Sequence, residues 1–344
     1  MIQPRVRAMM VAMAASMKTI ADQLTAIEPV AAGPRPIVSV MIPVYEPDRF
    51  LIDAVKSVLA GGIGREEMQI AIVDDASPTC DVAKLIAEAG ASDRIELHRA
   101  DRNRGLAGNW NYCLQLARGR IVHVLHQDDV VAPQFYRRML PAFARRPEIG
   151  MAFCRHAFVD EWNRTERISH RERWFAGTLN NWLPKIAEWQ RIQCPAALVR
   201  RSAYEQLGGY RPDLHYALDW EMWVRIAAQF PVWYEPRVLA HYRRHASSET
   251  NRLRSMSKLD TDVLRAIEAF ADSLPRSQRN LLASRAYAAF AQRALRQMRE
   301  PGASGTQERL RPVRIAMERI THSDRSVKRL RADLREAERL AQLH

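Results

Sequence analysis

Several signatures of common protein classes are missing from this sequence. Its four cysteines include no CxxC pair, which excludes a zinc ribbon and a dithiol redox motif. No run of about 18 apolar residues occurs, so no membrane-spanning helix is expected. The GxGxxG fingerprint and the GK[ST] phosphate loop are also absent, which argues against a dinucleotide enzyme and a Walker ATPase. With so few cysteines in 344 residues, we expect free thiols in a reducing cytosol rather than a disulfide scaffold.

Acidic residues are in the minority, because 39 Asp and Glu face 52 Lys and Arg, which leaves a net charge of +13. Such a balance indicates an anionic partner: nucleic acid, a phosphate-bearing small molecule or an acidic membrane surface. Beyond residue 250 the basic residues outnumber the acidic ones by nine. Most of the excess charge therefore belongs to a C-terminal tail.

Shifts in composition divide the chain into three predicted segments, namely residues 1–34, 35–248 and 249–344. The first segment predicts an amphipathic helix followed by a linker, because apolar residues recur at helical spacing through Ile20, Leu24 and Ile27. A cleaved signal peptide is the alternative, since Arg5 and Arg7 precede a short apolar stretch. The third segment predicts basic helices.

The middle segment alternates strand-like apolar runs with runs of helical periodicity. The strand-like runs are residues 36–44, 68–73, 95–98 and 120–125. This alternation predicts an α/β domain whose parallel sheet is flanked by helices. In such sheets ligands bind beyond the carboxyl ends of the strands, and acidic pairs follow two of the runs directly. The sequence therefore predicts a site at that edge.

Asp128 and Asp129 form a candidate metal site after the fourth run. Two adjacent carboxylates repel each other unless a cation lies between them, and a hard divalent ion satisfies both charge and geometry. Such an ion would in turn bind a pyrophosphate. The alternative is helix capping, because Pro133 opens a helix soon afterwards and aspartate favours the N-cap position.

Two further groups are candidates for nucleotide binding. Asp74 and Asp75 follow the second run, where a carboxylate can accept hydrogen bonds from a base or a ribose; a turn or a cap is the alternative. Asn103 and Gly105 belong to a Gly- and Asn-rich loop that opens a helix, and free N–H groups at a helix start bind phosphate.

Asp219 is a candidate base, because burial beside aromatic residues would raise its pKa toward the working pH. Helix capping is the alternative for Asp219. Glu221 and Arg225 stand one helical turn apart, and a surface ion pair is the simplest interpretation. His245 ends a basic run in which the histidine can ligate metal and the arginines can neutralise phosphate; a basic surface stretch is the alternative.

The order of the short motifs resembles glycosyltransferase family 2. The motifs are Pro43-Val44-Tyr45, Asp74-Asp75-Ala76-Ser77, Asn103-Arg104-Gly105-Leu106, His126-Gln127-Asp128-Asp129, Gly208-Gly209-Tyr210, Leu218-Asp219-Trp220 and Tyr242-Arg243-Arg244-His245. The resemblance covers residues 36–250. It implies a GT-A fold, that is, a Rossmann-like mixed sheet flanked by helices, here with a helical C-terminal extension. It also implies an inverting transfer from a nucleotide sugar with Mg²⁺ or Mn²⁺.

The resemblance also implies roles for single residues, residue by residue. The implied nucleotide-binding positions are Pro43, Tyr45, Asp74, Asp75 and Asp128, to which the loop candidates Asn103 and Gly105 are added. Asp129 is expected to bind the metal, with His245 near the diphosphate and the metal. Asp219 matches the catalytic base, with Trp220 and Glu221 as acceptor contacts. The family often has Glu before this aspartate, whereas Leu218 stands here.

The catalytic domain is expected to have a nucleotide-binding half, residues 35–130, and an acceptor half, residues 131–248. The aromatic segment 158–195 is expected to shape the acceptor site. The QxxRW motif of processive synthases is absent, so a single sugar is expected to be added. UDP-sugars are the favoured donors, with TDP- and GDP-sugars as alternatives. The acceptor is expected to be a saccharide, either free or lipid-linked. A cytoplasmic location is predicted, with the basic tail and the N-terminal helix contacting the anionic inner face of the membrane. The alternative for the tail is that it completes the fold or forms a dimer.

Three other functions compete with this interpretation. A nucleic-acid-binding protein is opposed by the acidic pairs at the strand ends, and no nucleic-acid partner is expected. A catalytically inactive GT-A-like module that binds a sugar or a partner is the main alternative, although Asp129 and Asp219 are both present. A nucleotidyltransferase would carry a Gly-rich loop after the first strand, where Val44–Pro47 has no glycine.

Overall fold

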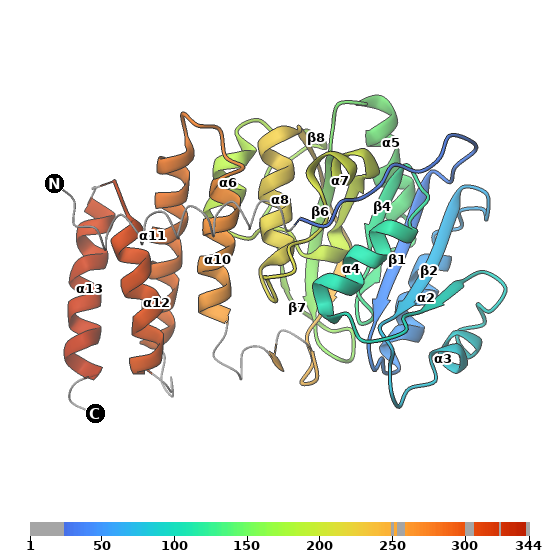
Figure 1. The fold of residues 1–344 in the computed structure, drawn as a ribbon, viewed down its shortest axis with the longest axis horizontal. Coiled ribbons are helices and arrows are strands. Elements are labelled where there is room, and N and C mark those ends of the chain that lie inside the picture. Colours follow the sequence, from blue (N-terminus) through green and yellow to red (C-terminus); the bar gives the residue numbers. More distant parts are fainter. Residues whose placement is uncertain (1–23, 249–250, 253–258, 300–305, 323–324, 342–344) are drawn as a thin grey trace, which may run out of the picture.

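The computed structural model describes residues 24–248, 251–252, 259–299, 306–322 and 325–341. A sheet of ten strands forms the middle of the molecule, and helices cover both of its faces (Figure 1). The strands are β1 (Val38–Val44), β2 (Met68–Asp74), β3 (Glu96–Arg99), β4 (Ile121–Val124), β5 (Val130–Val131), β6 (Met151–Val159), β7 (Thr165–Ile168), β8 (Gly177–Thr178), β9 (Ala197–Arg200) and β10 (Val232–Arg243).

The sheet order is β3-β2-β1-β4-β9-β6-β10-β5, with β7 paired to β6 and β8 paired to β10. The first four strands are mutually parallel, with Val44 opposite Asp74 and Met41 opposite Val124. Their carboxyl ends therefore meet at one edge, which we call the carboxyl edge. The mixed sheet implied by the family resemblance is confirmed.

A wholly parallel sheet, predicted from the alternation alone, is wrong beyond β4. β9 runs antiparallel to both β4 and β6. The reason is its entry point, because the short helix η1 (Cys194–Ala196) precedes β9 at the carboxyl end of β4, where the Cys194 thiol donates to the Val124 carbonyl at 3.5 Å. β10 then runs parallel to β6, so its end returns to the carboxyl edge.

The helices complete two cores, one on each face of the sheet. They are α2 (Phe50–Leu59), α3 (Val82–Glu88), α4 (Gly105–Leu116), α5 (Phe135–Arg145), α6 (Trp182–Glu188), α7 (Arg201–Leu207), α8 (Leu218–Gln229), α10 (Leu259–Ala271), α11 (Arg279–Met298), α12 (Thr306–Arg319) and α13 (Arg325–Ala341). One core lies under α2, α3 and α5, and the other under α4, α6 and α8.

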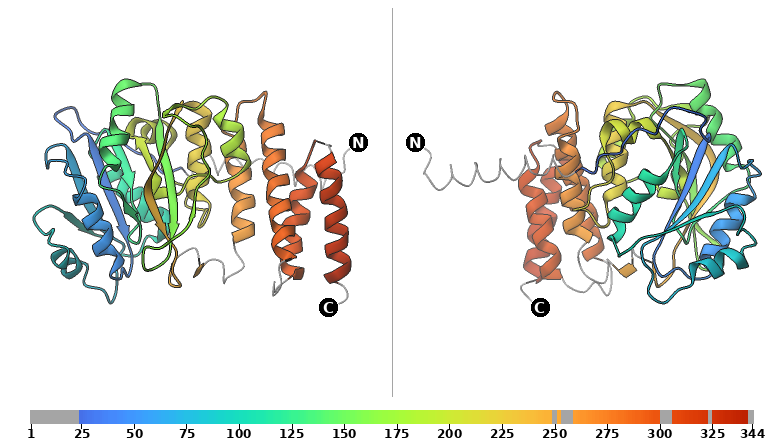
Figure 2. Two further views of the ribbon diagram at one scale, coloured as in Figure 1. Left: turned by 180° about the vertical axis from the view of Figure 1, so that it is seen from behind. Right: turned by 45° about the vertical axis from the view of Figure 1, so that its right-hand side comes forward.

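The C-terminal helices α10–α13 stand side by side and extend away from the sheet, as both views show (Figures 1 and 2). α10 packs on α8 and α11 packs on α6. Their buried residues, including Phe270 and Leu295, continue the core under α4, α6 and α8 without a break. The expected basic helical extension is present, and it shares its core with the α/β part.

The predicted N-terminal helix lies outside the described residues up to position 23. From Leu24 onward the chain is not helical, so the expected helical continuation through Ile27 is wrong. Its backbone is used by the domain instead: the Thr25 carbonyl accepts from Gly209 N–H at 2.8 Å, and the Glu28 carbonyl accepts from the Arg201 guanidinium at 2.8 Å. Ile27 is buried in the core.

The four cysteines form no disulfide, as expected. Within the described part of the chain, no helix has both the length and the apolar character needed to cross a bilayer.

Candidate active site

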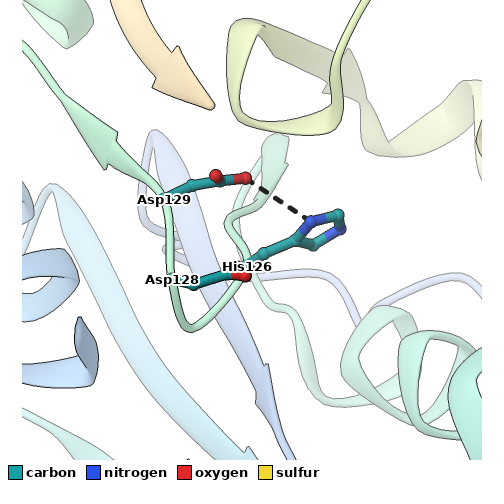
Figure 3. A group of neighbouring side chains, drawn as sticks. All are labelled: His126, Asp128 and Asp129. Carbon is teal, nitrogen blue, oxygen red and sulfur yellow. Dashed lines mark ion pairs between the residues drawn. The ribbon is translucent and has the colours of Figure 1, made fainter. Parts of the chain in front are cut away.

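The loop between β4 and β5 brings three potential metal ligands together at the carboxyl edge. His126, Asp128 and Asp129 offer atoms that all lie within 4.8 Å of one another. Figure 3 shows the two carboxylates and the imidazole on this one loop. Asp129 Oδ1 accepts the backbone N–H of Arg243 at 2.9 Å, and Asp129 Oδ2 lies 3.5 Å from His126 Nδ1.

Asp129 is the most confined of these side chains. It is fully buried, and its Oδ2 has no hydrogen-bond donor among the residues that the structure describes. Burial, together with the charge of Asp128, raises the pKa of Asp129 to about 6. An orphaned carboxylate oxygen beside a second carboxylate fits a divalent cation, which would stabilise both charges. The residues present therefore suit a metal ion.

Arg243, at the end of β10, holds this loop in place. Its Nε donates to the Asp128 carbonyl at 2.8 Å, and its guanidinium pairs with Asp53 at 3.2 Å. It also lies 4.4 Å over the ring of Phe50 and is buried. Because Arg243 is buried and every one of these contacts is internal, the alternative of a basic surface stretch is wrong for Arg243, and its role in neutralising phosphate stays a prediction.

The next two residues of this basic run differ from each other. The Arg244 guanidinium is exposed and pairs with Glu166 at 2.7 Å. His245 turns inward, and its Nε2 lies 2.8 Å from Asp128 Oδ2. This hydrogen bond to Asp128 raises the pKa of His245. The structure thus brings His245, Asp128 and Asp129 together, whereas Arg244 belongs to the surface.

The end of β1 lies beside the same loop. The Tyr45 N–H donates to Gln127 Oε1 at 2.9 Å, and Gln127 Nε2 donates back to the Tyr45 carbonyl at 3.3 Å. The side chain of Tyr45 is 48% exposed, whereas Pro43 is buried within the strand opposite Val73. Tyr45 is therefore the one of the two that can offer a ring to a ligand.

Asp75 directly follows β2, and its side chain contacts the start of α4. Its carboxylate accepts the N–H groups of Arg104 at 2.8 Å and Gly105 at 3.0 Å, and Asn103 Oδ1 also accepts from Gly105 at 2.9 Å. Burial raises the pKa of Asp75. The first turn of α4 is thus capped by these side chains, and Gly105 takes a positive φ of 72°. The capping alternative for Asp75 is confirmed, and its nucleotide-binding role stays a prediction.

Asp74 makes a turn. Its Oδ1 accepts the N–H of Ser77 at 3.0 Å and the Ser77 hydroxyl at 2.6 Å, while Oδ2 pairs with Arg99 at 3.1 Å. Its side chain is buried. Its contacts match the turn alternative, and Asp74 supports the neighbouring Asp75.

Asp219 sits in the first turn of α8, after the N-cap position, which is Ala217. The capping alternative for Asp219 is therefore wrong. Its Oδ1 accepts the N–H of Trp220 at 2.6 Å, and the Gln190 side chain donates to it as well. Burial raises the pKa of Asp219 to about 7, against the opposing effects of the Trp220 N–H and of nearby His126. A carboxylate with this pKa suits general base catalysis.

The side chains of the two predicted acceptor contacts are buried in the core. The indole of Trp220 is buried, donates to the Ile186 carbonyl at 2.6 Å and packs against Phe270. Glu221 is 1% exposed, and both its oxygens bind Arg225, at 2.9 and 2.7 Å. The pair is therefore buried, which makes the surface interpretation wrong, and its role is to hold the fold.

The glycine pair before α8 is explained by close backbone packing. Arg225 donates to the Gly209 carbonyl at 2.9 Å, and Asn111 exchanges hydrogen bonds with the backbone of Tyr210 at 2.7 and 2.8 Å. A Cβ on Gly209 would collide with the Asn111 side-chain oxygen. The motif thus joins α4 to the segment that leads into α8.

Sequence reasoning missed His126 and Gln190 as members of the site. His126 stands two residues before Asp128, just after a buried strand. This spacing could have indicated that His126 belongs to the metal site. Gln190 reaches Asp219 from the segment after α6, and nothing in its sequence neighbourhood marks it.

The family model for glycosyl transferase family 2 matches residues 39–208. A Bacillus subtilis (strain 168) protein, the candidate glycosyltransferase EpsE, is 34% identical over 205 residues, which cover 56% of this chain and 67% of that protein. The chain belongs to glycosyltransferase family 2. It is a glycosyltransferase.

A solved structure supports the fold assignment. The Staphylococcus aureus protein TarS, residues 1–349 in complex with UDP-GlcNAc, superposes with a TM-score of 0.66 at 13% identity, covering 87% of this chain and 88% of TarS 1–349. The fold is of the GT-A type, with the C-terminal helices beside it.

Another relative is the succinoglycan biosynthesis protein ExoO of Rhizobium meliloti (strain 1021). It is 33% identical over 115 residues, which cover 33% of this chain and 32% of ExoO. The chain spans 70% of the length of one of the first four curated relatives. It spans less than a third of the length of each of the other three, namely 12%, 20% and 32%.

Proposed function

We propose that the enzyme transfers a single sugar from a nucleoside-diphosphate sugar to a hydroxyl of a saccharide acceptor, with inversion at the anomeric carbon. This proposal rests on one observation: two carboxylates at the carboxyl edge, those of Asp129 and Asp219, lie in different environments. Asp129 is buried with an open oxygen beside Asp128, while Asp219 lies near His126 with a raised pKa. The first environment suits a cation and a diphosphate, and the second suits a base.

In the proposed reaction, Asp219 takes the proton of the acceptor hydroxyl. The freed oxygen forms the new bond to the anomeric carbon from the face opposite the diphosphate, and the old carbon–oxygen bond breaks with its electron pair leaving on the diphosphate. One base suffices because the diphosphate needs no proton to leave, unlike the leaving group of a glycosidase.

Asp128 and Asp129 would hold Mg²⁺ or Mn²⁺, with His126 as the third ligand. The ion would supply Lewis-acid stabilisation of the charge on the departing diphosphate. His245, held by Asp128, is placed to donate a hydrogen bond to a phosphate oxygen once that contact opens. The sequence prediction had Asp129 and His245 as the metal residues and Asp128 as a nucleotide contact. The proposed set adds His126 and Asp128 as ligands and moves His245 from the metal to the phosphate.

Tyr45 and Asp75 are the proposed nucleoside contacts. Tyr45 offers an exposed ring, and Asp75 keeps lone pairs beyond the two that it uses in capping α4. We favour a UDP-sugar, which TarS binds in its solved complex. The acceptor is proposed to be a growing polysaccharide or a lipid-linked saccharide, in line with the name of ExoO.

A nucleotide panel tests this function. Melting temperatures are measured with UDP, GDP, TDP and CMP, each with and without Mn²⁺, on the native enzyme and on the Asp129→Asn variant. A ligand at a hundred times its dissociation constant stabilises a protein by about 2.7 kcal/mol. We expect one diphosphate to stabilise the native enzyme only with Mn²⁺ and to leave Asp129→Asn unchanged.

The matched control is Asp93→Asn, which removes one carboxylate from an exposed position. It should respond as the native enzyme does. If no nucleotide stabilises the native enzyme under any condition, the proposal fails in favour of a GT-A-like module that binds a sugar or a partner without catalysis.

A further inference from the structure

A pocket outside the candidate active site lies on the outer edge of β10. There β8 pairs with Trp233 and Tyr234, and β5 pairs with Ala240 and His241, so residues 235–237 lie between two short partner strands. A cavity of about 450 Å³ opens at these residues, between the loop that leads into β8 and helix α5. Both β8 and α5 lie at the top of the molecule in Figure 1. None of the metal-site residues lines it.

The lining of this pocket is strongly basic. Arg138 comes from α5, Arg171 from the loop before β8 and Arg237 from β10. Across the described ranges, none of these three guanidinium groups has a carboxylate within 4.0 Å, although ion pairs are common elsewhere on the surface. Glu235 is the acid of the lining, and it is buried and accepts the Arg237 N–H at 3.1 Å. The pocket therefore keeps an excess of positive charge.

Two aromatic side chains of the lining are strongly exposed. Trp174 and Phe175 are 75% and 77% exposed, more than any other large hydrophobic side chain in the described residues. Arg171 lies 4.3 Å over the Trp174 ring. Adjacent exposed aromatic rings flanked by unpaired arginines are the composition that proteins use at the membrane–water interface.

The loop that presents these rings is held from both sides. Glu172 pairs with Arg191 at 2.9 Å and Lys185 at 3.3 Å, and its N–H donates to the Tyr234 hydroxyl at 3.1 Å. The Arg173 guanidinium donates to the Thr178 carbonyl at 2.9 Å. Trp174 and Phe175 are therefore exposed on a loop that is already held in place, so little conformational entropy is lost when they bind a surface.

We propose that this pocket docks the enzyme on an anionic membrane: the three arginines bind the phosphate of a lipid head group, and Trp174 and Phe175 enter the interface. The high exposure of both rings, beside arginines that have no carboxylate partner, favours an anionic lipid surface over a soluble glycan. The proposal is independent of the proposed sugar transfer. It also places membrane contact in the α/β part, whereas the charge pattern of the sequence pointed to the tail.

Vesicle sedimentation tests the proposal on the full chain. Binding is measured to phosphatidylcholine vesicles and to an equimolar mixture with phosphatidylglycerol. The variants are Arg138→Gln/Arg171→Gln/Arg237→Gln and Trp174→Ala/Phe175→Ala. At roughly fivefold in affinity per basic residue near an anionic surface, the triple variant should bind about a hundredfold more weakly to the mixture. The aromatic variant should also lose binding, whereas phosphatidylcholine alone should bind none of the proteins well.

Two controls match these variants in chemistry. Trp162→Ala removes a 62% exposed ring from the turn between β6 and β7, and Arg329→Gln/Arg331→Gln/Arg335→Gln removes three exposed charges from α13. Both should bind vesicles nearly as the native enzyme does. Equal losses in the α13 triple variant and the pocket triple variant would overturn the proposal, because general charge would then explain binding.

Inorganic phosphate and pyrophosphate form the second arm of the test. If either one binds in a manner that needs the three pocket arginines, while vesicles do not bind at all, the pocket serves a soluble phosphate and the membrane proposal is wrong. Absence of vesicle binding by the native enzyme overturns it as well. Circular dichroism and melting temperature establish that each variant is folded.

Discussion

Asp262 joins the C-terminal helices to the segment that carries the proposed base. It lies in the first turn of α10 and is buried. Its carboxylate accepts the backbone N–H groups of Ala217 at 2.8 Å, Tyr216 at 2.7 Å and His215 at 3.1 Å. These three residues immediately precede α8, in which Asp219 is the second residue.

Replacing Asp262 by alanine leaves these three donors without an acceptor. A buried donor left unsatisfied costs about 1–3 kcal/mol, and of the three residues Ala217 is buried. We therefore expect Asp262→Ala to lower the free energy of unfolding by about 3 kcal/mol. With an m-value of about 3 kcal/mol/M, the urea midpoint should fall by about 1 M. Asp262→Asn keeps one acceptor oxygen and should lose less.

Urea unfolding followed by tryptophan fluorescence and by far-ultraviolet circular dichroism is the assay. The control is Asp272→Asn, because the Asp272 carboxylate is exposed directly after the end of α10. The two signals should move together, because α10 and α8 share one core. The reasoning is refuted if Asp262→Ala shifts the midpoint no more than the control does, or if the C-terminal helices unfold in a separate earlier transition.

Three further outcomes follow from the site. Because burial raises the pKa of Asp219 to about 7, and the base acts in its deprotonated form, the transfer rate should fall as pH drops below that value; a flat pH profile would contradict this. Arg243→Met should weaken Mn²⁺-dependent nucleotide binding, measured by calorimetry, by about tenfold or more, because the metal-site loop loses its brace, whereas Arg244→Met should not. Glu221→Gln should lower the unfolding free energy by about 3–5 kcal/mol by leaving Arg225 buried and unpaired, and restoration of much of this stability by adding Arg225→Met would support the assignment.

The parallel half of the fold and its acidic residues could be predicted from the sequence. Strands that alternate with helices must be parallel when neighbouring, and residues that follow them meet at one edge. Asp129 and Asp75 were therefore expected at the carboxyl edge, where the structure has both. This expectation needed only local patterns, namely apolar runs and the residues that end them.

The second half depends on contacts between distant segments, which local patterns do not contain. Arg243 looks like a surface cation in the sequence, yet it is buried because Asp53 and the Asp128 carbonyl satisfy its charge. Glu221 looks like a site residue because it stands near Asp219, yet on a helix those two positions face different ways. Periodicity within one helix could not show which face is covered by α10.

The most direct test of the account compares the native enzyme with Asp219→Asn in two measurements on one preparation. The first is Mn²⁺-dependent binding of the nucleoside diphosphate found in the panel, and the second is the rate of sugar transfer to acceptor. The account predicts unchanged binding and a transfer rate lower by a factor of about 10²–10⁴, the range expected for loss of a general base. Full transfer activity in Asp219→Asn would contradict the central assignment of Asp219 as the base.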